Sequence, residues 1–450
     1  MKISVMKISV NLLTALMLAS TAVVASGQAP CKPVCAPDAS NVSNRIPNRA
    51  VVLYGDPTKA DSVVLAVYYS REYLDFNDPD APRFMLLDRE GKIAFGIGGS
   101  LYAIGSYDFK GAVDDSKFTT YEIAVPSNPE LRQRLGGDLR RSSLTANLAG
   151  KIPYFNTFKV YFQLDFEGAN GKYGARLKQA YAQLGHFTAG LTHSTFVDGA
   201  AQAPSIDPQG PCGQIDDKQV LFRYTTPTWH GFSAATGFEF PDVSMTQGTR
   251  TVNGEETDVT KSIPQRVPVI PAFVQYSWKP GSHVRFAALF RDLCYRDLLS
   301  GKNRFSAGYG VKASFIFREG MFEPFGHFSY GKGISSFAND IADNGYDLVP
   351  VSGEPGRLHT IPSMTWTGGL YLHFTPKFFA TASASRCQVF DCAHLGPDSY
   401  RYGMYYCANA FFDVNDNLRL GMEYVHGKRA NYDGQSGTAN RLELLCQFSF

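Results

Sequence analysis

The sequence predicts an all-β protein, a sixteen-stranded antiparallel transmembrane β-barrel with a short N-terminal periplasmic extension. Residues 158–167 alternate strictly between apolar and polar side chains, over about the 9–11 residues that a tilted strand needs to cross a bilayer. Similar segments recur to the end of the chain, joined by alternately short and long connections. After the N-terminus, no apolar run reaches the roughly 18 residues of a transmembrane helix. A closed barrel is the remaining way to satisfy the backbone of a membrane-spanning chain.

The first 90 of the 450 residues do not show the strand pattern. Residues 1–27 combine Lys2 and Lys7, an apolar stretch and the small residues Ala25-Ser26-Gly27, which is typical of a signal peptide. Residues 28–90 are predicted to form the periplasmic extension, in which the apolar segment 62–73 fits either a helix or a strand. Residues 91–450 form the predicted barrel. Removing Lys2 and Lys7 with the signal peptide cancels the formal charge of +2, so net charge identifies no partner.

The predicted barrel strands alternate between two kinds of connection. The strands are expected near residues 92–109, 139–150, 157–168, 174–186, 187–196, 219–227, 230–240, 268–279, 282–295, 303–317, 321–334, 364–375, 378–390, 400–413, 416–430 and 438–450. The connections after the even-numbered strands are short, whereas those after strands 1, 5, 7 and 11 have roughly 20–30 residues. Short periplasmic turns and long external loops are the pattern of bacterial outer-membrane barrels, which predicts this location and the lipid bilayer as a partner.

The last strand ends on Phe450, and Leu442, Leu444, Cys446 and Phe448 share its face. A terminal Phe on an alternating strand resembles the signal that directs barrels to the barrel-assembly machinery, a second expected partner. The alternative is the edge strand of a soluble protein, but an exposed apolar edge invites aggregation.

The sequence contains no recognisable catalytic or cofactor motif. It has neither His-Glu-x-x-His nor Gly-x-Ser-x-Gly, and His193 and Ser194 would point to opposite faces of a strand. Of the eight cysteines, Cys31 with Cys35 and Cys387 with Cys392 are close enough in sequence to pair, and the other four have no obvious mate. The sequence contains no Cys-x-x-Cys pair with suitably spaced histidines, so it predicts no metal site. The basic residues are dispersed, which argues against nucleic-acid binding.

Residues 162–170 (FQLDFEGAN), 176–181 (RLKQAY) and 192–198 (THSTFVD) resemble the DcaP-like trimeric outer-membrane porins. Residues 204–212 and 80–99 extend the similarity, which covers about residues 78–450. The resemblance implies a sixteen-stranded homotrimer that takes up small, often anionic solutes such as dicarboxylates. It also implies an N-terminal extension, which in this family can be a helical coiled coil; the sustained heptads of a coiled coil are absent here. Gln179 interrupts the apolar outer face of an early strand, so we expect these strands to form the trimer contact.

The alternation predicts more positive than negative side chains on the inward face. A charge at a lipid-facing midplane position costs about 2–4 kcal/mol, which favours the lumen for all of them. The expected inward cations are Arg141, Lys159, Arg176, Lys178, Arg223, Lys279, Arg285, Arg291, Lys312, Arg318, Arg386, Arg401, Arg419 and Arg441. The expected inward acids are Asp165, Glu167, Glu239, Glu323, Glu423 and Glu443. We expect Arg141, Lys159, Asp165, Glu167, Arg176, Lys178, Arg223, Arg285 and Arg291 to line a pore and set its selectivity. The alternative for each arginine is a solvated position near a rim.

The connection at residues 197–218 is the predicted constriction. It contains Asp198, Asp207, Asp216 and Asp217, and no cation before Lys218. In general porins the third external loop folds into the barrel, and here it would place these acids opposite Arg141, Arg176, Lys178 and Arg223. The alternative is an exposed loop.

The excess of inward cations predicts a porin for passive diffusion of small hydrophilic, mainly anionic solutes. Two other functions remain open: a membrane-embedded hydrolase, and a structural or adhesive barrel. The hydrolase would need a paired Ser and His, and the structural barrel would need a plug because sixteen strands enclose too wide a lumen for side chains to fill.

Overall fold

The computed structural model of this chain describes residues 51–54, 61–69, 84–111, 116–168, 171–240, 242–252, 254–391 and 393–450. The predicted signal peptide, much of the predicted extension, and Cys31, Cys35 and Cys392 lie outside these residues.

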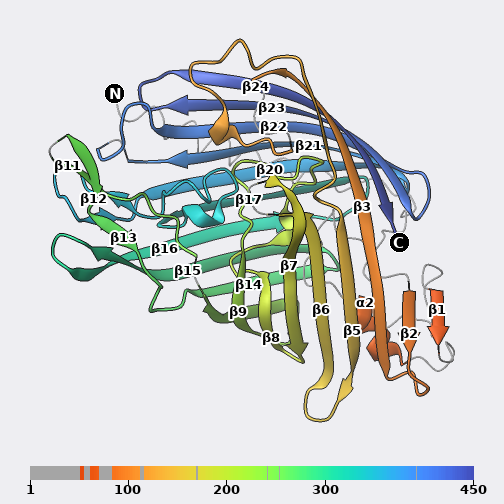
Figure 1. Ribbon diagram of the computed structural model, residues 1–450. Coiled ribbons are helices and arrows are strands. Elements are labelled where there is room, and N and C mark those ends of the chain that lie inside the picture. Colours follow the sequence, from red (N-terminus) through yellow and green to blue (C-terminus); the bar gives the residue numbers. More distant parts are fainter. Residues whose placement is uncertain are drawn as a thin grey trace. The chain divides into compact units, whose positions relative to one another are not determined.

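Sixteen antiparallel strands pair in chain order, and the last strand pairs with the first (Figure 1). They are β3 (Ile93–Lys110), β5 (Ser143–Ile152), β6 (Asn156–Glu167), β7 (Tyr173–Leu184), β8 (Phe187–His193), β9 (Lys218–Thr225), β10 (Phe232–Glu239), β14 (Ile270–Lys279), β15 (Ser282–Asp297), β16 (Lys302–Ile316), β17 (Phe322–Lys332), β20 (Pro362–Thr375), β21 (Phe378–Val389), β22 (Tyr400–Asp413), β23 (Leu418–Asn431) and β24 (Ser436–Ser449). β4 (Arg134–Asp138) precedes β5 and extends its pairing with β3, and β13 (Thr260–Ser262) pairs with β15. Leu442 pairs with Tyr107 and Phe448 with Leu101, which closes the barrel. The predicted sixteen-stranded barrel is confirmed.

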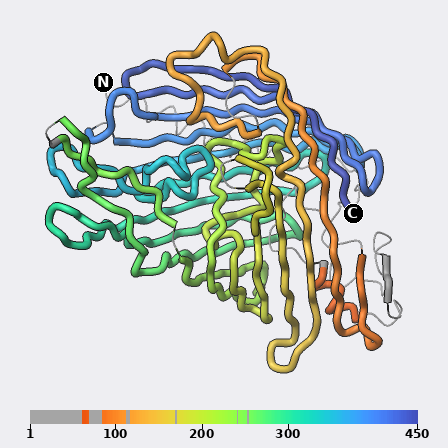
Figure 2. The backbone as a smooth tube through the Cα atoms, viewed as in Figure 1, coloured from red at the N-terminus to blue at the C-terminus, as the bar shows by residue number. Residues whose placement is uncertain are grey.

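The backbone trace shows the blue C-terminal strands beside the orange β3 at the closure (Figure 2). Four long connections, at residues 111–133, 194–217, 240–269 and 333–361, alternate with short turns as the sequence predicted. The long connections carry short elements of their own: η2 (Thr120–Glu122), η4 (Gly199–Ala201), β11 (Thr249–Val252), β12 (Glu255–Asp258), η5 (Ser335–Phe337), β18 (Val349–Pro350) and β19 (Leu358–His359).

Each barrel strand separates an apolar outer face from a more polar inner face. On β6, Phe162 and Leu164 are exposed outward while Gln163 and Asp165 are buried inward. The same exposed outer face carries Val274, Phe286, Phe328, Met422 and Leu444 on later strands. A closed ladder with this outer face satisfies both requirements of a bilayer, apolar side chains outside and no unpaired strand edge.

One residue of β7 is added to the ladder and reverses the side-chain alternation. Gln163 pairs with Gln179 but Leu164 pairs with Leu177, which leaves Lys178 as a β-bulge. Gln179 therefore points inward, where its amide donates to Gln163 Oε1 at 3.0 Å and it accepts from Thr192 Oγ1 at 3.0 Å. The prediction that Gln179 interrupts the outer face is wrong, because the extra residue at the bulge shifts the alternation by one position.

Two arginines predicted to point inward lie on the outer side of their strands. Arg386 lies between the fully buried Ser385 and Cys387, and its guanidinium stacks 4.1 Å from the centre of the Tyr402 ring. The preceding residues 380–385 are all small (ATASAS), so they give little contrast with which to fix the alternation. Arg401 is exposed next to the buried Tyr400, at a register shift in β22.

The described part of the N-terminal extension joins the barrel at its seam. β2 (Phe84–Leu87) pairs with β3 at residues 94–97, next to the place where Phe450 exchanges backbone hydrogen bonds of 2.9 and 3.0 Å with Gly99. β1 (Val51–Tyr54) pairs with β2 in parallel. β2 therefore covers the edge of β3 that β24 leaves unpaired.

A short helix, α2 (Ser62–Tyr69), settles the structure of the segment that fitted either helix or strand. Asp61 caps its N-terminus by accepting from the backbone N–H of Val63 at 2.9 Å. Val64, Leu65 and Tyr68 are buried against a cluster that includes Ala94 and Ala149 of the inward faces of β3 and β5. Among the described residues, no helix combines the length and apolar character needed to cross a membrane.

Candidate functional site

The connection between β8 and β9, residues 194–217, is packed inside the barrel. Phe196, Val197, Ile206 and Ile215 are completely buried in the clusters that also contain inward side chains of distant strands. Pro204, Pro208 and Pro211 restrict its backbone and remove three N–H groups that would otherwise need partners in this buried position. The segment, here called the inner loop, contacts the barrel wall at four places.

The first contact is between Asp198 and the strands β15 and β16. Its carboxylate lies 2.9 Å from His283 Nε2, accepts from Ser314 Oγ at 2.5 Å and lies 3.8 Å from Arg285. Arg285 also donates to the backbone oxygen of Val197 at 2.9 Å. Burial by itself raises the pKa of Asp198, but the charge of Arg285 and the His283 hydrogen bond, with Lys312 nearby, hold that pKa below its usual range. Asp198 is therefore a buried carboxylate in a cationic surrounding.

The second contact places the middle of the inner loop on β22 and β23. Glu423 accepts from Ser205 Oγ at 2.8 Å and from the backbone N–H groups of Ile206 and Asp207 at 2.8 and 3.1 Å. From the opposite side, Arg141 donates to the backbone oxygens of residues 205–207 at 3.1–3.3 Å. One acid and one base therefore hold three consecutive loop residues.

Asp207 is turned back onto its own loop and onto residue 118. It accepts from the backbone N–H of Phe118 at 3.0 Å and of Gly210 at 3.1 Å, and from the hydroxyl of Tyr405 at 3.2 Å. Burial and the nearby charge of Glu423 raise its pKa to about 6, against these backbone hydrogen bonds.

The third contact depends on Gly213. Its N–H donates to Ser385 Oγ at 2.8 Å, and its oxygen lies 3.0 Å from His327 Nε2. A Cβ at this position would lie 2.2 Å from the backbone oxygen of Arg386, so only glycine fits against the wall. The loop then pairs with the 333–361 connection through Ile215 and Ala338.

The fourth contact returns the inner loop to β8 and β9. Asp216 lies 3.0 Å from His193 Nδ1 and 3.5 Å from Lys218. Burial opposes ionisation of Asp216, but the charges of Lys218, His193 and Lys178 keep its pKa below the usual range. Asp217 differs: burial raises its pKa to about 7 although Gln219 donates to it at 2.6 Å. Neighbouring acids thus have opposite shifts.

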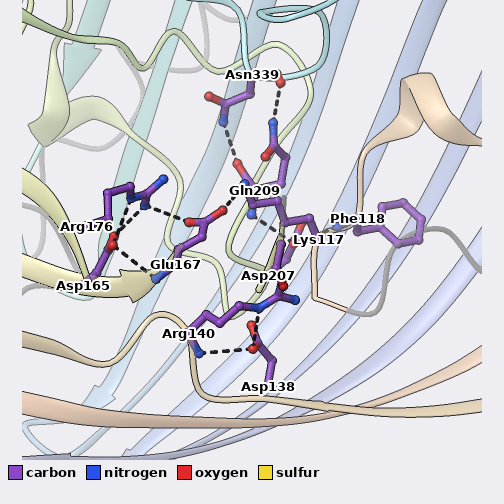
Figure 3. Close-up of polar contacts among 11 residues, drawn as sticks. Lys117, Phe118, Asp138, Arg140, Asp165, Glu167, Arg176, Asp207, Gln209 and Asn339 are labelled. Carbon is purple, nitrogen blue, oxygen red and sulfur yellow. Dashed lines mark hydrogen bonds and ion pairs between the residues drawn. The ribbon is translucent and has the colours of Figure 1, made fainter. Parts of the chain in front are cut away.

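Three predicted wall residues on β6 and β7 form a charged cluster with one another (Figure 3). Arg176 donates to both oxygens of Asp165, at 2.9 and 2.6 Å, and to Glu167 at 2.8 Å. The side chain of Arg176 is 46% exposed whereas that of Asp165 is 5% exposed, so the guanidinium is the accessible member. Lys117, which the sequence did not single out, forms an ion pair with Glu167. It lies in the first long connection, where no periodicity marks inward residues.

Three predicted wall cations point inward but are covered. Lys159 and Arg223 are 4% and 3% exposed, and Arg291 is 0% exposed. Arg291 donates to the backbone oxygen of Gly333 at 2.6 Å and pairs with Asp347 at 3.2 Å, so it fastens the 333–361 connection rather than lining an open surface. His193 and Ser194 contact different acids, since Ser194 donates to Glu239 at 2.6 Å.

The comparisons with known proteins identify the fold. No family model matches the chain, and no curated protein matches it. Among solved structures, the outer membrane channel DcaP of Acinetobacter baumannii has a TM-score of 0.67 at 18% identity, over 81% of this chain and 99% of that one. Outer-membrane expressed OmpT of Vibrio cholerae has a TM-score of 0.50 at 9% identity, over 81% of this chain and 100% of that one. The chain therefore has the fold of outer-membrane channel barrels, and the likeness to the DcaP channel agrees with the resemblance seen in residues 162–198.

Proposed function

We propose that this protein is a porin of the bacterial outer membrane, through which small hydrophilic solutes diffuse passively. The apolar outer face fits a bilayer, and the fold is that of channel barrels. The observation that carries the proposal is the inner loop, which is held within the barrel by β15 and β16 at one contact and by β22 and β23 at another. A segment held in this way narrows a wide lumen to a size at which side chains can select solutes.

We further propose a preference for anions, with dicarboxylates as the solute class. Asp198 is outnumbered by Arg285 and Lys312, and Asp216 lies among Lys178 and Lys218. Without Arg386 and Arg401, cations still outnumber acids in the predicted inward set. The side chain of Arg176 is 46% exposed, and its Nη1, which is not the donor to Asp165 or Glu167, can donate a charge-assisted hydrogen bond to a solute carboxylate.

Reconstitution in planar bilayers tests both proposals. We expect stepwise conductance and, in a salt gradient, a reversal potential on the anion side. Succinate added on one side should reduce the chloride current.

Replacing the two cations in Arg176→Gln/Lys178→Gln should lower the anion preference, while Lys261→Gln, on an exposed position of β13, should leave it unchanged. Absence of conductance steps would refute the porin, whereas a cation preference would refute only the anion proposal.

We propose that the barrel forms a homotrimer and is assembled through its C-terminal strand. The resemblance of residues 162–198 to trimeric porins supports the first proposal, and the outward Leu444 and Phe448 of β24 support the second. Native mass spectrometry should show three chains per particle, and a monomer would contradict the trimer. Phe450→Ala should reduce the amount of folded barrel in the outer membrane, and unchanged assembly would contradict the role of Phe450.

A further inference from the structure

Three side chains from two connections, residues 333–361 and the connection after β21, converge on one another. His359 Nε2 of β19 lies 2.9 Å from Asp391 Oδ2, and His394 Nδ1 lies 2.9 and 3.1 Å from the two oxygens of Asp391. The centres of the two imidazole rings are 4.2 Å apart. One potential ligand atom from each residue lies within 4.8 Å of the others.

The carboxylate at the centre of this cluster is held by the chain around it. Asp391 Oδ1 accepts from the backbone N–H groups of Ala393 at 3.2 Å and His394 at 3.3 Å. The backbone N–H of Asp391 donates to the hydroxyl of Tyr432 at 2.8 Å, and that hydroxyl donates to Val389 at 2.7 Å. Partners of this kind fix the orientation of metal ligands in known sites. The side chain of Asp391 is 8% exposed, so its position is determined by these contacts.

We propose that His359, Asp391 and His394 bind a divalent transition-metal ion, for which Zn²⁺ is the appropriate probe. Two imidazoles and one carboxylate are a donor set that suits Zn²⁺, with water in the remaining position. Zn²⁺ bonds of about 2.0–2.2 Å in a tetrahedron separate ligand atoms by about 3.3–3.6 Å. The two histidine–Asp391 separations of 2.9–3.1 Å need only a small outward movement, and the two imidazole nitrogens lie within 4.8 Å of each other.

The position of the site gives the ion a route of entry and a structural effect. The side chains of His359 and His394 are 30% and 28% exposed, so external solution reaches both imidazoles. A metal ion would cross-link the 333–361 connection to the connection after β21. The former also contacts the inner loop, since Asp216 N–H donates to Phe337 at 3.1 Å. His359 precedes Asp391 by 32 residues and His394 follows it by three. This spacing does not match the Cys-x-x-Cys pattern of zinc sites, so the sequence did not predict the site.

The proposal is tested by titrating Zn²⁺ into the full protein, purified in detergent without a histidine tag. Thiols, including the exposed Cys446, are first alkylated so that they do not bind the ion. We expect saturable calorimetric binding of one ion per chain and a Zn²⁺-dependent rise in melting temperature. His359→Gln and His394→Gln should each weaken binding at least tenfold, and Asp391→Asn should weaken it while it preserves the backbone hydrogen bonds.

The matched control is His373→Gln. His373 forms a similar pair with a carboxylate, 3.3 Å from Glu323, but no third ligand completes a metal site there among the residues that the structure describes. Zn²⁺ binding to this variant should equal that of the unmodified protein. The inference is overturned if the His359→Gln/His394→Gln double variant, melting normally without metal, binds Zn²⁺ as the original chain does. It is also overturned if the original chain shows no saturable binding.

Discussion

Asp198 and Asp207 are nine residues apart in the inner loop, and each is 1% exposed, yet they are held in opposite ways. Asp198 faces His283, Arg285 and Lys312, and its pKa lies below the usual range. Asp207 lies near Glu423, and burial with that second negative charge raises its pKa to about 6. Although the two side chains are equally buried, Asp198 stays ionised in mild acid, whereas Asp207 takes up a proton near pH 6. The charge on the wall, rather than depth, decides the state of a loop acid.

The opposite pKa shifts give the two contacts opposite pH dependence. The lowered pKa of Asp198 contributes stability above the unfolded value of 3.8, and this contribution is lost as the pH falls through the lower folded pKa. The raised pKa of Asp207 has no cost below 3.8 and costs stability as the pH rises from 3.8 through about 6. Neutral pH thus favours the contact at β15 and β16, and mild acid favours the contact at β22 and β23.

The largest expected effect is that of Asp198→Ala. Removing this carboxylate leaves the partly buried Arg285 and the buried Lys312 without its negative charge, and breaking a buried ion pair costs about 3–5 kcal/mol. We expect the inner loop to leave the wall, with a higher single-channel conductance and faster protease cleavage within residues 194–217. Glu256→Ala, at an exposed position of β12, is the control. An unchanged conductance in Asp198→Ala would show that Asp198 does not hold the loop.

A smaller effect of opposite sign is expected for Asp207→Asn. Removing the negative charge relieves its repulsion with Glu423, and the pKa rise from 3.8 to about 6 corresponds to about 3 kcal/mol at pH 8. Each carboxylate oxygen of Asp207 accepts two hydrogen bonds, so replacing one oxygen by an amide nitrogen loses two of them and offsets roughly 1–3 kcal/mol of this gain. The variant should therefore unfold at a higher temperature than the original chain at pH 8, and at the same temperature or lower at pH 4. A loss of stability at pH 8 equal to that of Asp198→Ala would remove the distinction between the two contacts.

The strands were predictable from the sequence because a bilayer imposes a strict pattern on them. Phe162 and Leu164 had to face outward, and the alternation of short and long connections agreed with the count of sixteen strands. The pattern fails where the chain departs locally from it. The bulge at Lys178 turns Gln179 inward, and the small residues before Arg386 give no contrast between faces.

The partners of the loop acids could not be predicted, because they depend on contacts between residues far apart in the sequence. The sequence placed Asp198 and Asp207 in one loop with equal roles, and nothing in it indicated that one meets His283 and the other Phe118. The cluster of His359, Asp391 and His394 was missed for the same reason. Periodicity orients a side chain within its own strand, but it does not say which strand or loop lies opposite.

The smallest expected effect concerns Asp217, which extends the comparison to the end of the inner loop. Its pKa of about 7 means that it is protonated in mild acid and ionised at pH 8, mainly because burial disfavours the charge. Acidification from pH 8 to 6 therefore removes a negative charge from the proposed constriction. The ratio of anion to cation permeability should rise, by less than about fivefold, since one half-buried charge contributes under about 1 kcal/mol. Reversal potentials measured against pH should show this step in the original chain and in Asp242→Asn, an exposed control, but not in Asp217→Asn. A step that persists in Asp217→Asn would assign the titration to another group, such as Asp207 with its pKa of about 6.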